Sequence, residues 1–175
     1  MKKEIIFAGF GGQGVLLAGK IICNGAMHEG NYVTYLPAYG PEMRGGTANC
    51  SVVISDVQIA SPILGDIDIL LAMNQPSYDK FVKRVRADGV IVYNKSLVNQ
   101  VDENDTRNVA VDFTNLAGEL GNVRVCSMIA LGSLVAKTKV ISMEQLMIEM
   151  KKLAAKKPEL VTLNEKAINL GASLI

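Results

Sequence analysis

A glycine-rich turn near the start of the chain has the residue types and the spacing to bind another molecule through its backbone. It follows the uninterrupted apolar run of residues 5–8, which predicts a buried parallel strand. The turn consists of Gly9, Phe10, Gly11, Gly12, Gln13 and Gly14. Glycine permits positive φ angles and lets a partner approach the backbone closely. Apolar residues at helical spacing over 13–29 then predict a helix, whose unpaired first amides would favour an anion.

Gly9, Gly11 and Gly14 match the glycine pattern of dinucleotide-binding domains, in the expected strand–turn–helix context. The rest of that pattern is missing. An NAD site expects an acidic residue at the end of the second strand, which we place at residues 32–36, but the first acid after it is Glu42, inside the next loop. Two interpretations besides NAD(P) binding stay open. One is a tight turn that only packs helix on sheet, and the other is a site for a different phosphate-bearing ligand or a partner surface.

A second loop carries charged residues between glycines. Residues 39–47 read Tyr-Gly-Pro-Glu-Met-Arg-Gly-Gly-Thr, which places Glu42 two positions before Arg44. In a doubly wound fold this loop leaves the carboxyl end of the second strand, at the edge where such folds bind ligands. We therefore expect it beside the first glycine turn. A turn with a surface ion pair is the alternative, and such a pair contributes little energy.

The elements that must position these loops predict an α/β fold: a single three-layer Rossmann-like domain over residues 1–175, with a mostly parallel sheet. Residues 47–55 alternate between apolar and polar, as in a strand with one buried face. The turn signal at Ser55-Asp56 predicts a short return strand over 57–60, so we expect an antiparallel hairpin here.

Three further segments predict buried elements. A strand over 67–73 precedes a helix that Asn74 would cap and that would extend to about Arg86. Residues 127–136 are apolar nearly all round, which indicates a helix buried in the core or under a partner chain. Lys157-Pro158 begins the last helix, since proline suits the first helical turn.

Two motifs together resemble the gamma subunit of the 2-oxoacid:ferredoxin oxidoreductases. They are Gly-Phe-Gly-Gly-Gln-Gly-Val over 9–15 and Tyr-Gly-Pro-Glu-Met-Arg-Gly-Gly over 39–46. The same unit is the gamma domain of single-chain pyruvate:ferredoxin oxidoreductases. The resemblance covers nearly the whole chain, because Asn-Gln-Pro over 74–76 and Glu-Leu-Gly-Asn over 119–122 are also similar to family features. One departure is Ser127, where many members carry Asn.

The resemblance implies a subunit whose activity belongs to a complex. Complexes of this family decarboxylate a 2-oxoacid on thiamine diphosphate, pass electrons through iron–sulfur clusters to ferredoxin, and release acyl-CoA. Thiamine diphosphate and the clusters are implied on the alpha and beta partner subunits, and on a delta subunit where one is present. CoA is the candidate ligand of this chain. Ser-Pro-Ile-Leu over 61–64, combined with Asn-Gln-Pro over 74–76, is most similar to the 2-oxoglutarate and branched-chain members, so 2-oxoglutarate is the favoured substrate.

Within that resemblance, the turn from Gly9 to Gly14 would contact a CoA phosphate or a neighbouring subunit. The candidate donors are the amides of Gly11, Gly12 and Gln13. Arg44 would pair with a CoA phosphate or a partner carboxylate, and Glu42 would orient Arg44 or cap a neighbouring helix. The sequence shows no nucleophile with a base and no metal-binding set, so we expect neither a catalytic residue nor a metal ligand in this chain.

The composition excludes several partners. A net charge of +1 gives no reason to expect nucleic acid or a membrane surface, and no apolar run approaches the about 20 residues that span a bilayer. With a strand at its very start the chain leaves no room for a signal peptide, so we expect a cytoplasmic protein. Cys23, Cys50 and Cys126 are too widely spaced to hold zinc or an iron–sulfur cluster by themselves. The first two are expected to be small buried residues.

Two other classes of function stay open. One is a free-standing nucleotide- or CoA-binding regulatory module. The other is an NAD(P)-dependent dehydrogenase, but the acidic residue that would bind the ribose is missing. If the subunit interpretation holds, isolated chains are also expected to self-associate, because a subunit without its partners exposes an apolar patch.

Overall fold

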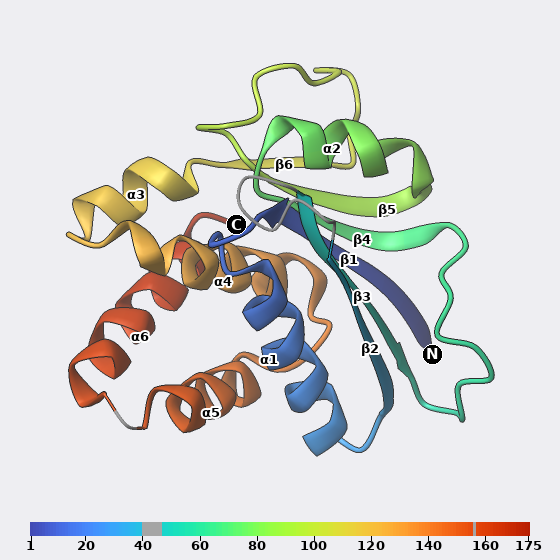
Figure 1. Cartoon of the computed structure of the whole chain (residues 1–175), viewed down its shortest axis with the longest axis horizontal. Helices are drawn as coiled ribbons and strands as arrows, with labels where there is room; N and C mark the ends of the chain where they lie inside the picture. Colours follow the sequence, from blue (N-terminus) through green and yellow to red (C-terminus); the bar gives the residue numbers. More distant parts are fainter. Residues whose placement is uncertain (40–46, 156) are drawn as a thin grey trace.

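A six-stranded sheet with the order β2-β3-β1-β4-β5-β6 lies at the centre of the computed structural model, which describes residues 1–39, 47–155 and 157–175 (Figure 1). The strands are β1 (Lys2–Phe10), β2 (Tyr32–Tyr39), β3 (Thr47–Ser55), β4 (Ile67–Ala72), β5 (Val85–Asn94) and β6 (Asn108–Val111). The pairs β1–β4, β4–β5 and β5–β6 are parallel, whereas β3 is antiparallel to both of its neighbours. The predicted α/β class with a mostly parallel sheet is therefore confirmed.

Helices cover both faces of the sheet. They are α1 (Val15–His28), α2 (Gln75–Phe81), α3 (Phe113–Glu119), α4 (Cys126–Thr138), α5 (Met143–Ala154) and α6 (Pro158–Ser173), with short 3-10 turns η1 (Val82–Arg84) and η2 (Val123–Val125). Figure 1 shows α2 on one face, and α1, α4, α5 and α6 gathered on the other. Alternate residues of β1 enter different cores, Ile5 and Phe7 on the α1 side and Ile6 and Ala8 on the α2 side. Burial on both faces explains why this strand is apolar without interruption.

Helix α4 is the central helix of the larger core, and every residue from Ser127 to Val135 is buried. It crosses α6 at backbone contact. A Cβ added to Gly132 would lie 2.1 Å from the carbonyl oxygen of Ile168, and one added to Gly171 would lie 2.0 Å from that of Ile129. The prediction of a buried helix over 127–136 is confirmed. Helix α4 is apolar nearly all round because α6 covers the side that would otherwise face solvent.

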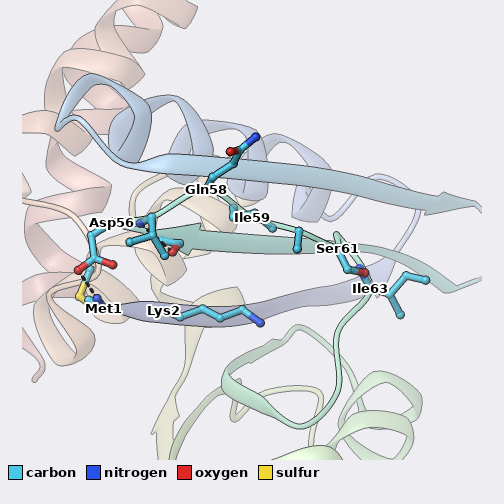
Figure 2. Close-up of a pocket in the computed structure, with 10 residues that line it drawn as sticks. Met1, Lys2, Asp56, Gln58, Ile59, Ser61 and Ile63 are labelled. Atoms are coloured by element: carbon cyan, nitrogen blue, oxygen red, sulfur yellow. Dashed lines mark hydrogen bonds and ion pairs between the residues drawn. The ribbon is translucent and has the colours of Figure 1, made fainter.

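The predicted hairpin is formed by different strands. Residues 57–60 form no strand; the antiparallel hairpin consists of β2 and β3. The reason lies in β3 itself, because β1 pairs with it on one side and β2 on the other along its whole length, which leaves no edge for a return strand. The chain instead leaves β3 at Asp56, whose amide donates to the carbonyl oxygen of Met1 at 3.1 Å. Figure 2 shows Gln58, Ile59 and Ser61 on the extended segment that follows.

The helix that Asn74 caps is shorter than predicted. The Asn74 side chain accepts a hydrogen bond from the Ser77 amide, as expected of a cap, but α2 ends at Phe81 and the chain enters β5 at Val85. Arg86, predicted near the end of the helix, therefore belongs to a strand. Long-range ion pairs of Arg86 with the neighbouring strands override the local helical spacing.

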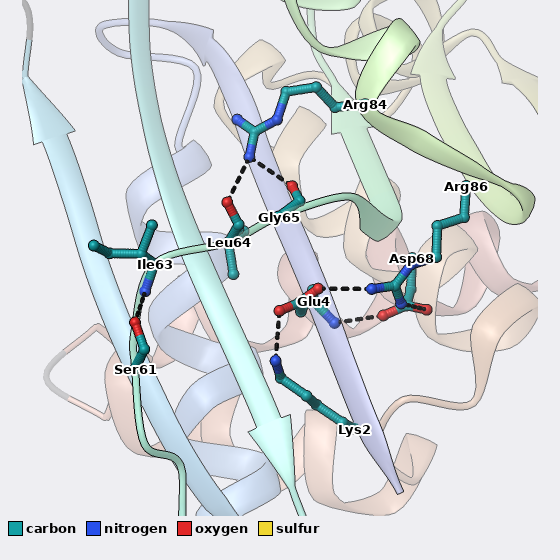
Figure 3. A network of polar contacts seen from close by, with 9 residues as sticks. All are labelled: Lys2, Glu4, Ser61, Ile63, Leu64, Gly65, Asp68, Arg84 and Arg86. Atoms are coloured by element: carbon teal, nitrogen blue, oxygen red, sulfur yellow. Dashed lines mark hydrogen bonds and ion pairs between the residues drawn. The ribbon is translucent and has the colours of Figure 1, made fainter.

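A network of charged side chains closes the amino-terminal edge of the sheet (Figure 3). The carboxylate of Glu4 is buried, and it accepts from Lys2 Nζ at 2.7 Å and from Arg86 Nη2 at 3.0 Å. Asp68 joins the network, because it pairs with Arg86 Nη1 at 2.8 Å and accepts from the Glu4 amide at 2.7 Å. The guanidinium of Arg86 thus holds two carboxylates of adjacent strands together.

Replacing Arg86 with methionine should lower the free energy of unfolding by about 1–2 kcal/mol, because the buried Glu4 carboxylate keeps only one cationic partner. Equilibrium urea denaturation of the chain measures the change. Lys83→Met is the matched control, since Lys83 is exposed and makes no ion pair within the part of the chain that the structure describes. Equal stability of the two variants would show that the network does not stabilise the sheet.

Candidate functional site

The glycine turn lies at the carboxyl edge of the sheet, between β1 and α1. Gly12 and Gly14 have φ angles of 93° and 76°, in the left-handed region that favours glycine. Among the described residues, the amides of Gly11, Gly12 and Gly14 donate to no acceptor, whereas the Gln13 amide donates to the carbonyl oxygen of Phe10 at 3.1 Å. The turn therefore offers three unpaired amides, with Gly14 in the place that we expected for Gln13. Such a concave run of amides is suited to an anion.

The side chain of Gln13 braces the turn from within. Its Oε1 accepts from the amide of Phe10 at 2.7 Å and from Nδ2 of Asn74 at 2.9 Å. Its Nε2 lies 3.5 Å from the carbonyl oxygen of Met73. Because Asn74 caps α2, this side chain connects the turn to the end of β4 and to the start of α2. Gln13 therefore shapes the site, and its side chain does not point outward to a ligand.

The glycines of the turn divide into two kinds. A Cβ on Gly9 would lie 2.7 Å from Gln13 Oε1 and 2.9 Å from Val15 Cγ1, and one on Gly14 would lie 2.7 Å from Ser127 Oγ. These two glycines permit close packing. Among the described residues, a Cβ on Gly12 would meet nothing within 4 Å. Gly12 is therefore open to an approaching molecule. A turn that only packs helix on sheet would not need this opening.

A pocket of about 250 Å³ adjoins the turn. Its lining residues are Gly12, Gln13, Leu97, Thr114, Val123, Arg124 and Cys126. Val123 and Arg124 belong to η2 and Cys126 is the first residue of α4, so one wall of the pocket lies ahead of α1 and the other where η2 runs into α4. Sequence reasoning missed Arg124 and Thr114. They belong to no recognisable motif, and the only signal for them was their position ahead of predicted helices at the carboxyl edge.

The charges around this pocket are mixed. Neither α1 nor α4 has an acidic residue in its first turn or a side-chain cap of its own, so the partial positive charge at the start of α1 is uncompensated. Helix α4 instead continues directly from η2, whose start is capped by the Asn122 side chain, which accepts from the Arg124 amide. Burial raises the pKa of the Cys126 thiol to about 11, which keeps it neutral near pH 7. The Asp112 carboxylate caps α3 and accepts from Ser96 and Asn115. These hydrogen bonds lower its pKa, so it keeps its negative charge, which also acts on Cys126 in the pocket wall.

The residues that flank the second predicted loop lie at the same edge of the sheet. Glu42 and Arg44 lie outside the described residues, so their roles stay predictions. The residues that flank the loop are described. Thr47 pairs with Phe10 of the glycine turn, and Tyr39 pairs with Ala48. Thr47 therefore lies beside the first turn, whereas Tyr39 lies one strand further away, because β3 separates β2 from β1. The position of the loop itself stays a prediction.

The other candidate groups are structural. Cys23 and Cys50 are buried, as predicted, and burial raises their pKa values to about 11 and about 12. Over the described ranges, no group of three or more His, Cys, Asp or Glu side chains could hold a metal ion. None of the helices in those ranges has both the length and the hydropathy that crossing a bilayer requires.

Fold and site together define a Rossmann-like α/β domain whose first turn offers unpaired amides at the ligand-binding edge of the sheet. The chain belongs to the pyruvate ferredoxin/flavodoxin oxidoreductase family, whose model matches residues 4–174. It is 39% identical over 133 residues to ketoisovalerate oxidoreductase subunit VorA of Methanothermobacter marburgensis, and the match covers 76% of this chain and 28% of VorA. It is 35% identical over 150 residues to 2-oxoglutarate synthase subunit KorC of Methanocaldococcus jannaschii, covering 83% and 80% of the two chains. The chain thus spans only about a quarter of VorA but most of KorC.

Solved structures agree with this assignment. The gamma subunit of a keto/oxoacid ferredoxin oxidoreductase from Geobacter sulfurreducens PCA matches with a TM-score of 0.82 and 33% identity, over 98% of this chain and 97% of that one. A 2-oxoglutarate:ferredoxin oxidoreductase from Magnetococcus marinus, solved with 2-oxoglutarate, coenzyme A and succinyl-CoA bound, matches with a TM-score of 0.88 and 25% identity, over 99% of this chain and 31% of that one. The resemblance to gamma subunits seen in the sequence is confirmed.

Proposed function

We propose that the chain is the gamma subunit of a 2-oxoacid:ferredoxin oxidoreductase and supports the CoA-dependent oxidation of 2-oxoglutarate to its acyl-CoA. The match to a gamma subunit along the full length of both chains carries this proposal. KorC supports 2-oxoglutarate, since it matches over most of its own length. The relatives also include ketoisovalerate and pyruvate types, so the choice of substrate is the part that most needs an experiment.

The remaining parts of the activity are assigned to partner chains. Thiamine diphosphate would supply the decarboxylation chemistry and iron–sulfur clusters would carry the electrons, and the described residues contain no group of His, Cys, Asp and Glu side chains that could hold a metal ion. We place both on alpha and beta subunits, with a delta subunit where the complex has one, in a cytoplasmic assembly that reduces ferredoxin. CoA fits this chain better, because the Gly12 amide, which has no acceptor among the described residues, and the exposed Arg124 line the same pocket. The turn from Gly9 to Gly14, with Glu42 and Arg44, would contact a CoA phosphate or a partner subunit.

Affinity purification of the chain from its native cells under anaerobic conditions tests this function. We expect large partner subunits to co-purify, and we expect CoA-dependent viologen reduction to be fastest with 2-oxoglutarate among 2-oxoglutarate, pyruvate and 2-oxoisovalerate. Assays without CoA are the control. A preference for another oxoacid would contradict the substrate only. A chain that returns alone and inactive from cells growing on oxoacids would contradict the subunit function and favour a free-standing CoA- or nucleotide-binding module.

A further inference from the structure

We propose that a second pocket, between the edge strand β6 and the segment that joins β5 to β6, binds a small aliphatic diamine or polyamine. The pocket has a volume of about 480 Å³. It shares no described lining residue with the pocket at the glycine turn, so the proposed site is independent of the function proposed above. Carboxylates, a tyrosine hydroxyl and apolar side chains meet in it.

Hydrogen bonds to two neighbouring elements hold the wall of this pocket in place. The wall belongs to residues 95–107, which Figure 1 shows as a yellow-green segment beside α2 and β6. From α2, Gln75 Oε1 accepts from the amide of Gln100 at 2.9 Å. From β6, Asn108 Nδ2 donates to the carbonyl oxygen of Asp102 at 3.2 Å. The wall is therefore anchored on two sides, as in a largely preformed binding site.

Tyr93 lines the pocket beside Ala110, its neighbour on β6. It is only 7% exposed, and its ring packs edge-on against Tyr78 with the ring centroids 5.6 Å apart. The Tyr78 hydroxyl donates to Asn108 Oδ1 at 3.0 Å, whereas the Tyr93 hydroxyl makes no hydrogen bond with any residue that the structure describes. A polar group on so nearly buried a side chain normally has a partner. A donor in the pocket would supply it.

Two carboxylates of the pocket have no cationic partner. Asp102 and Glu103 are exposed and make no ion pair within the described ranges. Asp105 also lines the pocket, but it pairs with Arg107 Nη2 at 2.6 Å. Burial, and then the charge of Glu103, raise the pKa of Tyr93, so this carboxylate acts on the unpartnered hydroxyl. Oxygen acceptors of both kinds thus face the same space, which suits an ammonium group because it only donates.

The pocket keeps an excess of negative charge although a lysine lines it. Lys95 is the one cation among its described lining residues. The pKa of Asp112, outside the pocket, is lowered first by its hydrogen bond from Ser96 and also by the charge of Lys95, so this lysine has an acidic neighbour of its own. Val98 and Val101 also line the pocket and offer contact to methylene groups. Ammonium groups joined by methylenes match this combination of charge and apolar surface.

The ligand is an organic cation and not a metal ion. Over the part of the chain that the structure describes, no three His, Cys, Asp or Glu side chains could hold a metal. The volume of about 480 Å³ lies within the about 300–1,000 Å³ typical of pockets for small molecules. The pocket therefore has room for a whole diamine.

NMR titration of the full chain with putrescine (1,4-diaminobutane) tests the site. At about 0.15 M salt, which screens attraction between distant exposed charges, we expect saturable shifts confined to the amides of residues 93–110. Tyr93→Phe should weaken binding about tenfold, because it removes the hydroxyl acceptor and changes no charge. Glu103→Gln should weaken binding by a similar factor. Glu159→Gln is the matched control, since it removes an exposed carboxylate from α6, on the other face of the sheet.

Two results would overturn the proposal. Shifts that do not saturate, or that are the same in Tyr93→Phe as in the unmodified chain, would show attraction by charge alone. Tyr93→Phe breaks no hydrogen bond of the described chain, so its melting temperature should be unchanged, and a loss of binding would not reflect unfolding. Nα-acetyl-lysine methylamide presents a lysine side chain as the second probe. If it binds more tightly than putrescine, the occupant is a lysine of a partner chain, and the free diamine is wrong.

Discussion

Replacing Gly132 with alanine is expected to lower the free energy of unfolding by about 3 kcal/mol or more. The new Cβ would lie 2.1 Å from the carbonyl oxygen of Ile168, so α4 and α6 would have to move apart. Overpacking in a core commonly costs about 1–3 kcal/mol, and a backbone atom cannot give way as a flexible side chain can. The separation would also weaken the hydrogen bond of 2.9 Å from the Ser133 hydroxyl to the Gly171 carbonyl oxygen. Equilibrium denaturation in guanidinium chloride measures the loss.

Three further variants make this prediction specific. Gly171→Ala should cost a similar amount, because its Cβ would lie 2.0 Å from the Ile129 carbonyl oxygen in the same helix crossing. The double variant should cost less than the sum, since one separation of the helices relieves both contacts. Gly118→Ala is the matched control in α3, where a Cβ meets nothing within 4 Å, and it should stabilise by about 0.5–1 kcal/mol. Similar effects at Gly118 and Gly132 would show that the crossing is not tight.

The second large effect is expected at Gly14. Alanine there would adopt a φ of 76° and place its Cβ 2.7 Å from Ser127 Oγ and 2.9 Å from Ser127 Cβ. The left-handed backbone costs about 1–2 kcal/mol, and the contact adds about 1–3 kcal/mol. We therefore expect a loss of about 3 kcal/mol, measured by urea denaturation, together with a raised KM for CoA in the assembled complex.

Gly12→Ala separates the two contributions. Gly12 has a φ of 93°, but its Cβ would meet none of the residues that the structure describes within 4 Å, so only the backbone cost of about 1–2 kcal/mol should remain. Ser127→Gly in the Gly14→Ala background should recover part of the stability, because it removes the contacting atoms. If Gly12→Ala and Gly14→Ala were equally unstable, the packing of α1 against Ser127 would contribute nothing.

The sequence predicts an element when the element's own residues show which of its faces are buried. The apolar run over 5–8 predicts β1, and the apolar stretch over 127–136 predicts the buried α4. Strand partners are not predictable in this way, because alternation over 47–55 identifies which face is buried but not which strands lie alongside. The prediction of a return strand over 57–60 is therefore wrong, because β1 and β2 already occupy both edges of β3.

The residues of the candidate site likewise fall into two groups: those that a local sequence pattern predicts and those that only the packing of distant elements brings together. Gly9 to Gly14 are contiguous, and their spacing gives the turn and its helix. Arg124 reaches the pocket only through the packing of α4 beside α1, which no local pattern encodes. The braced position of the Gln13 side chain is also tertiary, because its partners Met73 and Asn74 follow β4. The amide of Gln13, expected to be a donor to a ligand, instead donates to the carbonyl oxygen of Phe10 within the turn.

The antiparallel strand β3 also sets the order in which the nascent chain can assemble. β1 leaves the ribosome first, but it lies between β3 and β4 in the sheet, so both of its edges stay open until residues 47–55 and 67–72 have followed. A strand with six consecutive buried residues is thus the one that waits longest for its neighbours, and loop closure over such separations is slow. Helix α1 can cover only one of its faces in that interval. Early in synthesis, the segment that later carries the glycine turn is the part of the chain most exposed to unproductive strand pairing.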